Sequence, residues 1–346
     1  MPDTLRPRIL MIYTGGTIGM KENPVTKALE PFDFNHLLDN VPKLKKLDYD
    51  IHYHQFHTPI DSSDMNPRHW GQIVKVIEDN YLDYDGFVVL HGTDTMAYTA
   101  SALSFMLQQL SKPVIITGSQ LPIGEVRTDG EENLITAIQI AAAKDTDGSP
   151  MIREVAILFE NYLWRGNRST KRSADNFNAF RSNNYPELAK IGLGISFNKD
   201  VLWRSPVKDA PLGVHYNMDT NVTFLDLFPG IQENVVRHIL NTPGLKAVVL
   251  KTYGAGNAPG EPWLFEAIRE AVGKGIVVIN ITQCPNGLVD PKRYSTGLEL
   301  AQTGVVPGHD LTSEAAITKL MYLVGRGMKP DEVRYYVQCN LCGEMS

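Results

Sequence analysis

Four clusters of small polar residues stand where they could carry out acyl-transfer chemistry. The sequence reads TGGT at residues 14–17, DSSD at 61–64, HGTDT at 91–95 and GSQ at 118–120. Short apolar runs precede the first, third and fourth clusters. Because sites in an open parallel sheet form beyond the carboxyl ends of its strands, we expect these hydroxyls, glycines and carboxylates to converge on one edge.

The residue types in these clusters suggest nucleophilic catalysis. Glycines let backbone amides come close to a ligand, where they can hold an oxyanion or a carboxylate. A threonine hydroxyl attacks a carbonyl only when a base accepts its proton, and the candidates are Asp94, beside Thr93, and Lys171, in the polar segment 165–171. A glycine-rich turn can also be structural or bind phosphate, but the chain has no Gly-x-Gly-x-x-Gly and no Gly-Lys-Ser/Thr motif.

The elements that must position these clusters read as a parallel sheet with crossover helices. Apolar runs alternate with segments of helical period, which is typical of an α/β fold. Asn66 and Pro67 predict a helix start at 67, as N-cap and first helical residue. The predicted strands are 8–13, 86–90, 113–117 and 154–159, and the predicted helices are 67–81, 96–110 and 131–143.

The same pattern starts again after a polar, proline-containing stretch. Strands are predicted at 221–227, 245–250 and 275–281, and helices at 231–240, 261–272, 311–325 and 330–340. This restart predicts a second, smaller α/β domain. We therefore expect an N-terminal catalytic domain at 1–200, a linker at 201–213 and a C-terminal domain at 214–346.

Composition excludes several other classes of protein. The formal net charge is −6 without an evident basic run, which argues against nucleic-acid binding. The apolar run after the polar first residues is too short for a signal peptide or a membrane span. Three cysteines among 346 residues are no disulfide framework, so we expect a cytoplasmic protein with no membrane contact.

Histidines and cysteines offer weaker candidates for chemistry. His52 and His54 would share one face of a strand, with His57 and His91 elsewhere, but no carboxylate or cysteine stands at a matching spacing for a metal. Cys339 and Cys342 form a Cys-x-x-Cys without the second pair that a zinc ribbon needs. We therefore expect no metal and no organic cofactor, and we expect His91 to shape its turn.

Two stretches of the chain carry a family resemblance. Residues 9–19, ILMIYTGGTIG, and 86–96, GFVVLHGTDTM, resemble the two signature stretches of the asparaginase family. The similarity continues through 61–65, 165–171, 253–259 and 282–284, so it covers nearly the whole chain. The details are most similar to the bacterial type I, cytoplasmic asparaginases, which carry Asp-Ser-Ser where the type II enzymes carry Gly-Ser-Gln.

The resemblance implies hydrolysis of L-asparagine by a larger N-terminal domain with a parallel-rich sheet and a smaller C-terminal domain, assembled as a homodimer or homotetramer. Thr17 matches the primary nucleophile of the family. Thr93, Asp94 and Lys171 match a second triad that helps to deliver water. The substrate-binding positions match Asp61, Ser62, Ser63, Thr93 and Asp94, with the two serines at the α-carboxylate and Asp94 at the α-ammonium.

One departure from the family pattern concerns the segment after Thr17. Many relatives carry a tyrosine there that helps to activate the nucleophile, whereas residues 18–33 of this chain contain none. Glu22, Glu30, Lys171 acting through a water, or a residue from elsewhere could take that role, and the sequence does not choose between them. The polar segment 21–27 still predicts a lid-like loop.

Some type I relatives bind a second asparagine at an effector site. The matching positions here are Thr170, Lys251, Thr282, Gln283 and Cys284, where Lys251 stands in place of an arginine. Arginine grips a carboxylate with two parallel hydrogen bonds and lysine does not, so we expect weak cooperativity. The alternative is that Lys251 only caps its strand at the surface.

Two other functions fit parts of the pattern. The asparaginase-like subunit of a transfer-RNA amidotransferase shares the catalytic motifs but carries an extra N-terminal domain, and here the first strand begins near Arg8. A non-catalytic amino-acid sensor on the same scaffold could lose a nucleophile, whereas this chain keeps all the catalytic hydroxyls. The sequence leaves open weak glutaminase activity.

Overall fold

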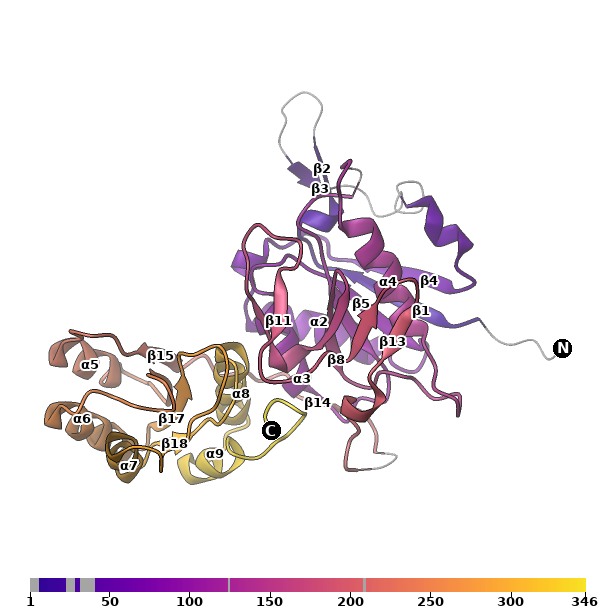
Figure 1. Ribbon diagram of the computed structural model, residues 1–346. Coiled ribbons are helices and arrows are strands. Elements are labelled where there is room, and N and C mark those ends of the chain that lie inside the picture. The colour runs from indigo at the N-terminus through magenta and orange to yellow at the C-terminus, as the bar shows by residue number, and fades with distance from the viewer. Residues whose placement is uncertain (1–5, 23–28, 32–40, 124, 208–209) are drawn as a thin grey trace. The chain divides into compact units, whose positions relative to one another are not determined.

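The chain divides into two compact units. The computed structural model describes residues 6–22, 29–31, 41–123, 125–207 and 210–346. The first unit is Met1–Tyr216 and the second is Asn217–Ser346 (Figure 1). Residues 201–213, predicted as a linker, belong to the first unit, where Trp203 donates its backbone N–H to Glu154 and Gly213 pairs with Gln108. The units therefore part after Tyr216 instead of within the predicted linker.

An eight-stranded sheet forms the centre of the first unit. Its strand order is β13-β12-β9-β8-β7-β5-β1-β4. The five strands from β8 to β4 run parallel, and β9, β12 and β13 add an antiparallel edge. The bounds are β1 Arg8–Tyr13, β4 Asp50–Gln55, β5 Gly86–Leu90, β7 Val114–Thr117, β8 Val155–Phe159, β9 Tyr162–Arg165, β12 Ala189–Ile191 and β13 Ile195–Phe197.

Helices cover both faces of this sheet, as the buried apolar strands require. Helix α4, Gly130–Ala142, packs its apolar side against one set of alternate strand residues, including Met11, Val88 and Ile115. Helix α3, Met96–Met106, is buried along almost its whole length and lies against α2, Pro67–Asn80. The Asn66 side chain accepts the Arg68 N–H at 3.0 Å, which confirms the predicted N-cap of α2.

The order of the strands creates a switch point between β1 and β5. The chain leaves β1 toward β4 on one side, and it leaves β5 through α3 toward β7 on the other side. Loops that depart in opposite directions from neighbouring parallel strands leave a crevice between them, which is where ligands bind in such sheets. The loops that carry Thr17 and Thr93 follow these two strands.

The sequence pattern placed the main strands and helices well and missed the short ones. The predicted helix 96–110 is wrong at its end, because the chain leaves the helix at Leu107 and forms β6, Leu107–Gln108, which pairs with β14, Gly213–Val214. Gln109 then takes a φ of 62°, outside the helical region. Further short strands are β2 Met20–Glu22, β3 Leu29–Pro31, β10 Ser169–Lys171 and β11 Phe180–Ser182. Of the predicted lid loop, residues 23–27 lie outside the described part of the chain.

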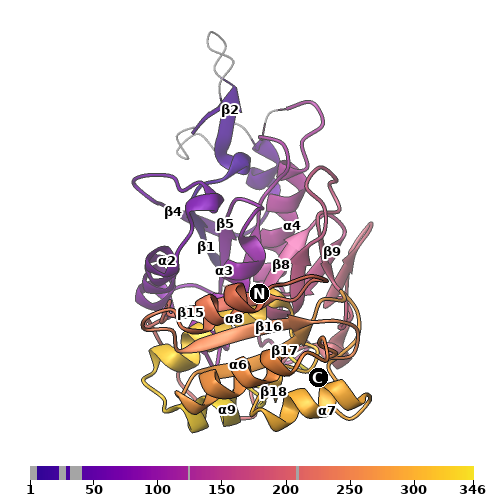
Figure 2. The same cartoon turned by 90° about the vertical axis from the view of Figure 1, so that its left-hand side faces the viewer.

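The second unit is built on a four-stranded parallel sheet of order β15-β16-β17-β18 (Figure 2). Helices α5 and α6 pack over one face through Val236, Leu240 and Ile268, and α8 lies against β15 and β16. This arrangement confirms the predicted second α/β domain. The bounds are β15 Val222–Asp226, β16 Ala247–Thr252, β17 Val277–Thr282, β18 Val306–Pro307, α5 Glu233–Leu240, α6 Pro262–Gly273, α7 Ser295–Gln302, α8 Ser313–Gly325 and α9 Pro330–Tyr336.

A buried ion pair fastens the last residues to the second unit. Lys319, on α8, contacts the Glu344 carboxylate at 2.5 Å, and both side chains are 0% exposed. The same ammonium donates to the carbonyl oxygens of Val337 and Cys339. Glu344 also accepts the backbone N–H groups of Leu341 and Cys342. Burial alone would raise the pKa of Glu344, but the Lys319 charge and these donors together hold that pKa below its usual range.

We expect Glu344→Gln to destabilise the second unit by about 3–5 kcal/mol, because the change leaves the Lys319 charge buried without its carboxylate partner. Urea unfolding followed by circular dichroism measures the effect. The matched control is Asp331→Asn, which breaks the Asp331–Arg334 ion pair, in which the aspartate is 93% exposed. It should change stability by less than about 1 kcal/mol.

The difference in free energy of unfolding between the wild type and Glu344→Gln should also depend on pH. A carboxylate whose pKa is lowered by folding stabilises the fold above its unfolded pKa, and the stabilisation is lost as pH falls through the folded pKa. The stability difference should therefore have its full size near pH 7 and shrink below about pH 4. If Glu344→Gln and Asp331→Asn lost the same free energy of unfolding at pH 7, this account of the Lys319–Glu344 pair would be contradicted.

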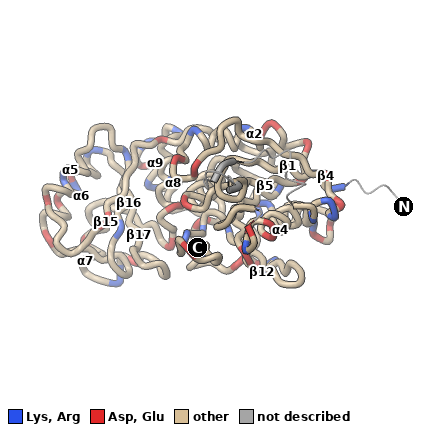
Figure 3. The backbone as a smooth tube through the Cα atoms, turned by 90° about the horizontal axis from the view of Figure 1, so that it is seen from above, with Lys and Arg blue, Asp and Glu red and all other residues tan. Residues whose placement is uncertain are grey.

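Charged side chains are distributed over both units. Figure 3 shows Lys and Arg interspersed with Asp and Glu along the backbone. Among the described residues, no helix has the length and apolar character needed to cross a membrane.

Candidate active site

The loops that follow β1 and β5 touch through two glycines. Gly16 has a φ of 88°, and a Cβ atom added there would lie 2.5 Å from the Gly92 nitrogen. A Cβ atom on Gly92 would lie 2.6 Å from the Ser62 hydroxyl oxygen. Side chains are therefore excluded at both glycines. The TGGT, DSSD and HGTDT segments meet at this point, as the sequence predicted.

Thr17 begins a short 3-10 turn, Thr17–Gly19, just beyond the contact between the glycines. Thr14 anchors the start of the loop, because its hydroxyl donates to the carbonyl oxygen of Leu90 at 2.9 Å. Ile18 is buried and holds the middle of the turn in the core, whereas Thr17 is only half-buried. The structure therefore places a partly exposed threonine on a short turn at the switch point.

Thr93, Asp94 and Lys171 come together although they are far apart in sequence. The Lys171 ammonium donates to the Thr93 hydroxyl oxygen at 2.9 Å and to the Asp94 carboxylate at 2.6 Å. The Lys171 side chain is 18% exposed and that of Asp94 is 65% exposed. Strand β10 ends at Lys171, where the chain pairs with Phe180 of β11, and this hairpin carries the ammonium to the loop after β5.

Gln120 is a further polar residue at this site, to which sequence reasoning gave no role. Its side-chain oxygen lies 3.4 Å from the Thr93 hydroxyl, in position to accept a hydrogen bond from it, and its side-chain NH₂ donates to Asn176. The Asp129 carboxylate accepts the Gln120 backbone N–H at 3.0 Å. The place of Gln120 in the GSQ cluster after β7 was the available signal, since the three strands β1, β5 and β7 are neighbours.

The loop with the two predicted carboxylate-binding serines is ordered by Asp61. The Asp61 carboxylate accepts both the N–H and the hydroxyl of Ser63 at 2.9 Å, and these bonds, the backbone one first, lower the pKa of Asp61. Ser62 is buried, and its carbonyl oxygen accepts the Thr95 hydroxyl at 2.6 Å. Thr95 therefore joins this loop to the one that carries Thr93.

His91 occupies the interior of the site. It is fully buried, and burial lowers its pKa to about 4, so the imidazole is neutral at ordinary pH. Its Nδ1 lies 2.6 Å from the Gly92 carbonyl oxygen and its Nε2 lies 2.9 Å from the Thr99 hydroxyl, which in turn accepts the Trp70 indole N–H. A neutral ring with its proton on Nδ1 satisfies all three bonds. The arrangement fits the turn-shaping role that the sequence suggested.

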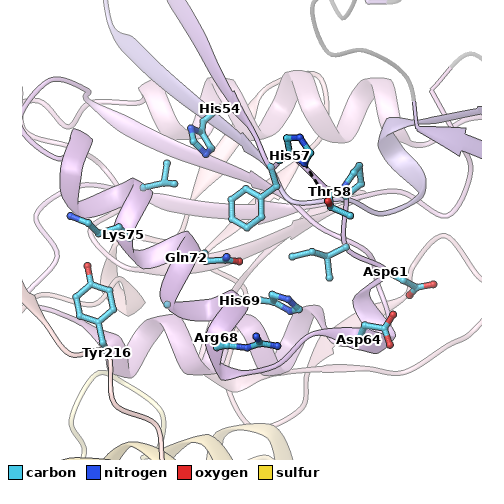
Figure 4. Close-up of a pocket in the computed structure, with 15 residues that line it drawn as sticks. His54, His57, Thr58, Asp61, Asp64, Arg68, His69, Gln72, Lys75 and Tyr216 are labelled. Atoms are coloured by element: carbon cyan, nitrogen blue, oxygen red, sulfur yellow. Dashed lines mark hydrogen bonds between the residues drawn. The ribbon is translucent and has the colours of Figure 1, made fainter.

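A cavity of about 810 Å³ lies beside this site (Figure 4). Its walls come from His54, residues 56–61, Asp64, the first turns of α2 and Tyr216. Among the residues that the structure describes, it shares only Asp61 with the predicted site. The contact that joins a hydroxyl, a carboxylate and an ammonium, that of Thr93, Asp94 and Lys171, lies outside the lining of this cavity.

The predicted effector residues divide between the two units. Thr170 lies on β10 of the first unit. In the second unit, Lys251 contacts Asp226 at 3.1 Å, and its backbone carbonyl accepts a hydrogen bond from the Gln283 side chain at 3.0 Å. Thr282 donates to Gly254, and the exposed Cys284 donates its N–H to Thr282. These last four residues therefore gather at the carboxyl ends of β16 and β17.

The described part of the chain holds no group of three or more His, Cys, Asp or Glu side chains arranged to bind a metal ion. The three cysteines all lie in the described part of the chain, and none of them forms a disulfide there.

Comparison with known proteins places the chain in a family. Residues 8–203 match the family model "Asparaginase, N-terminal", and residues 221–337 match "Glutaminase/Asparaginase C-terminal domain". L-asparaginase 1 of Escherichia coli K12 is 43% identical over 345 residues, 98% of each chain. A crystal structure of L-asparaginase I from Vibrio cholerae superposes with a TM-score of 0.89 at 40% identity, over 99% of both chains.

A more distant relative belongs to the rival functional class. A component of the glutamyl-tRNA(Gln) amidotransferase of Pyrococcus abyssi is 33% identical over 360 residues, which cover 98% of this chain and 77% of that protein. The two family models together span most of the sequence, and the similarity to the asparaginases covers nearly the full length of both partners. The chain therefore belongs to the asparaginase family of amidohydrolases.

Proposed function

We propose that this protein hydrolyses L-asparagine to L-aspartate and ammonia through an acyl-threonine intermediate on Thr17. The observation that carries the proposal is the contact of Lys171 with Thr93 and Asp94 beside the turn that bears Thr17. A hydroxyl, a carboxylate and an ammonium in hydrogen-bond contact are suited to moving protons during acyl transfer. The proposed reaction needs no metal and no organic cofactor.

In the first step, the Thr17 hydroxyl oxygen attacks the carbonyl carbon of the substrate's side-chain amide. The negative charge on the carbonyl oxygen is stabilised by a backbone N–H near Thr93. The C–N bond then breaks, and the proton that Thr17 gave up leaves with the amine as part of ammonia. The product of this step is an ester between Thr17 and the aspartyl group.

In the second step, water attacks the ester carbonyl and restores the Thr17 hydroxyl. Lys171 donates to Thr93 in the structure, while the Thr93 hydroxyl faces Gln120. The proposed triad orients the attacking water and takes up its proton, which is returned to Thr17 as the ester breaks. L-aspartate then leaves the site.

We propose that Ser62 and Ser63 bind the α-carboxylate of the substrate, in the loop held by Asp61. Ser63 donates its hydroxyl proton to Asp61 in the structure, so that hydroxyl must turn away from Asp61 to bind a carboxylate. The Oδ1 atom of Asp94 contacts Lys171, and we assign Oδ2 to the α-ammonium. This second charge pair would select an amino acid over a simple amide.

Ammonia release tests this function. We expect L-asparagine to be the preferred substrate over L-glutamine and D-asparagine, and we expect activity to survive dialysis against EDTA. Loss of activity with EDTA and its return with zinc would contradict the cofactor-free mechanism. Transfer of ammonia to an acylated transfer RNA in place of release would favour the amidotransferase function, and L-asparagine binding without ammonia release would favour the sensor.

A second part of the proposal concerns where the protein acts and how its subunits assemble. We propose that the protein acts in the cytoplasm as a homodimer or homotetramer, which the low cysteine content and the resemblance to type I asparaginases support. Light scattering coupled to gel filtration distinguishes the two assemblies.

We expect the rate of ammonia release to depend almost hyperbolically on asparagine concentration. The Lys251 ammonium already contacts Asp226, and a lysine cannot grip a carboxylate with the two parallel bonds that an arginine makes. Coupling between the sites should then fall below the ~1–3 kcal/mol of a typical allosteric pair. Steady-state rates of ammonia release over a wide range of asparagine concentrations measure this coupling.

Two variants at this position make the expectation on cooperativity sharper. Lys251→Arg should make the curve more sigmoidal, and Lys251→Ala should leave it close to hyperbolic. A strongly sigmoidal curve in the wild type that Lys251→Ala flattens would mean that lysine supports an effector site.

A further inference from the structure

Tyr13 connects the central sheet to the turn that carries Thr17. It is the last residue of β1 and comes directly before the TGGT segment. The side chain is 0% exposed, and its hydroxyl donates to the carbonyl oxygen of Gly19 at 3.1 Å. Gly19 ends the 3-10 turn that Thr17 begins. The phenol therefore binds the far end of the turn back to the strand from which the turn departs.

The ring of Tyr13 also packs against this turn. A Cβ atom placed on Gly19 would overlap the Tyr13 ring and its hydroxyl oxygen, so the Gly19 backbone lies directly against the ring. At the other end of the turn, Gly16 lies against Gly92 with equally little space. Close contacts therefore flank Thr17 on both sides: the Gly16 backbone lies against Gly92 of the loop after β5, and the Gly19 backbone lies against the Tyr13 ring.

The hydroxyl of Tyr13 stays a hydrogen-bond donor in the working range of pH. Burial raises the pKa of Tyr13 to about 12. The phenol is therefore protonated near neutral pH, and its bond to Gly19 is not weakened by ionisation.

The contact lies where a hairpin joins the sheet. Strand β2 begins at Met20, directly after Gly19, and pairs in antiparallel fashion with β3, so that Met20 lies opposite Pro31. Tyr13 stands at the junction and fixes the Gly19 carbonyl relative to β1.

We propose that Tyr13 is a positioning residue for Thr17, and that its phenol fixes the direction from which the Thr17 hydroxyl attacks. The inference rests on the proposed function, because it takes Thr17 as the nucleophile. Displacement of a reacting atom by about 1 Å can reduce a rate by about 100-fold. The phenol acts on the turn backbone and has no assigned contact with the substrate.

The variant Tyr13→Phe removes the hydroxyl and keeps the ring under Gly19. We expect kcat for L-asparagine to fall by about 10- to 100-fold. We expect KM to change little, since the substrate's charged groups are assigned to Ser62, Ser63 and Asp94. Rapid quenching with mass spectrometry should show slower formation of the ester on Thr17, a readout that a purely structural role would not change.

Tyr185→Phe provides the matched control. Tyr185 also donates its phenol to a backbone carbonyl, that of Val201 at 2.8 Å, so the same kind of bond is lost elsewhere in the first unit. We expect wild-type kcat from this folded variant. A wild-type kcat in Tyr13→Phe, or an equal loss of kcat in Tyr185→Phe, would overturn the inference.

A second variant keeps the test decisive if Tyr13→Phe does not fold. Gly19→Ala leaves the phenol in place but sets a methyl group against the ring, so the turn must shift, and kcat should fall with little change in KM. Wild-type kcat in folded Gly19→Ala would count against the inference. A wild type that releases no ammonia from L-asparagine would refute the proposed function and this inference with it, whereas wild-type turnover in Tyr13→Phe would refute the inference alone.

Discussion

Thr17→Ala is expected to lower kcat for L-asparagine by about 10⁴-fold or more while the fold stays intact, because the change removes the oxygen that attacks the amide. The side chain is half-buried and its turn is held by Ile18 and by the glycine contacts, so loss of its hydroxyl should barely change stability. Steady-state ammonia release and a thermal melt measure the two quantities separately.

Thr93→Ala should reduce turnover on a comparable scale but for a different reason. Residues that act as one catalytic unit show large, non-additive losses, so Thr17→Ala with Thr93→Ala should cost little more than either change alone. Thr146→Ala serves as the control, since Thr146 lies in the exposed turn between α4 and β8 and contacts Asp145. Turnover within tenfold of the wild type in Thr17→Ala would contradict the assignment of the nucleophile.

Lys171→Met is expected to be nearly inactive, and Lys171→Arg should recover little of the lost turnover. The ammonium contacts both Thr93 and Asp94, and proton transfer through this contact requires a group that can release and regain a proton. A guanidinium keeps its proton at ordinary pH, so arginine restores the charge without the transfer. Steady-state kcat values for the two variants, each checked for folding, measure the effect.

The surface lysine Lys199, which contacts Asp145, supplies the control variant Lys199→Met with expected wild-type turnover. Wild-type-like turnover in Lys171→Arg would mean that Lys171 contributes charge alone. The mechanism therefore does not allow a large loss of kcat in Lys171→Met together with full recovery of kcat in Lys171→Arg.

The main elements of the fold could be predicted because their signals are local. Residues 9–13 of β1 and all of β5 are buried, largely apolar runs, and Asn66 with Pro67 marks the start of α2. The short strands had no such signal. The helix after Met96 stops at Leu107 because Leu107 and Gln108 pair with a strand more than a hundred residues away, a contact that no local pattern contains.

The site could be predicted only in part for the same reason. The strand-end clusters indicated where Thr17, Ser62 and Thr93 would meet, because parallel strands end on one edge. Only family resemblance joins Lys171 to Thr93 in the sequence, because the approach of Lys171 depends on the β10–β11 hairpin. The sequence pattern marks Tyr13 only as the end of a buried strand. Its bond to Gly19 depends on a turn geometry that residue types alone do not specify.

The location of the covalent intermediate tests the central claim most directly. Lys171→Met, in which both threonines remain, should accumulate the acyl-enzyme, because the proposed triad acts in hydrolysis of the ester. After incubation with L-asparagine and quenching in acid, peptide mapping by mass spectrometry should find one aspartyl group on the peptide that carries Thr17. An aspartyl group on the peptide that carries Thr93, with Thr17 unmodified, would contradict the assignment of Thr17 as the nucleophile.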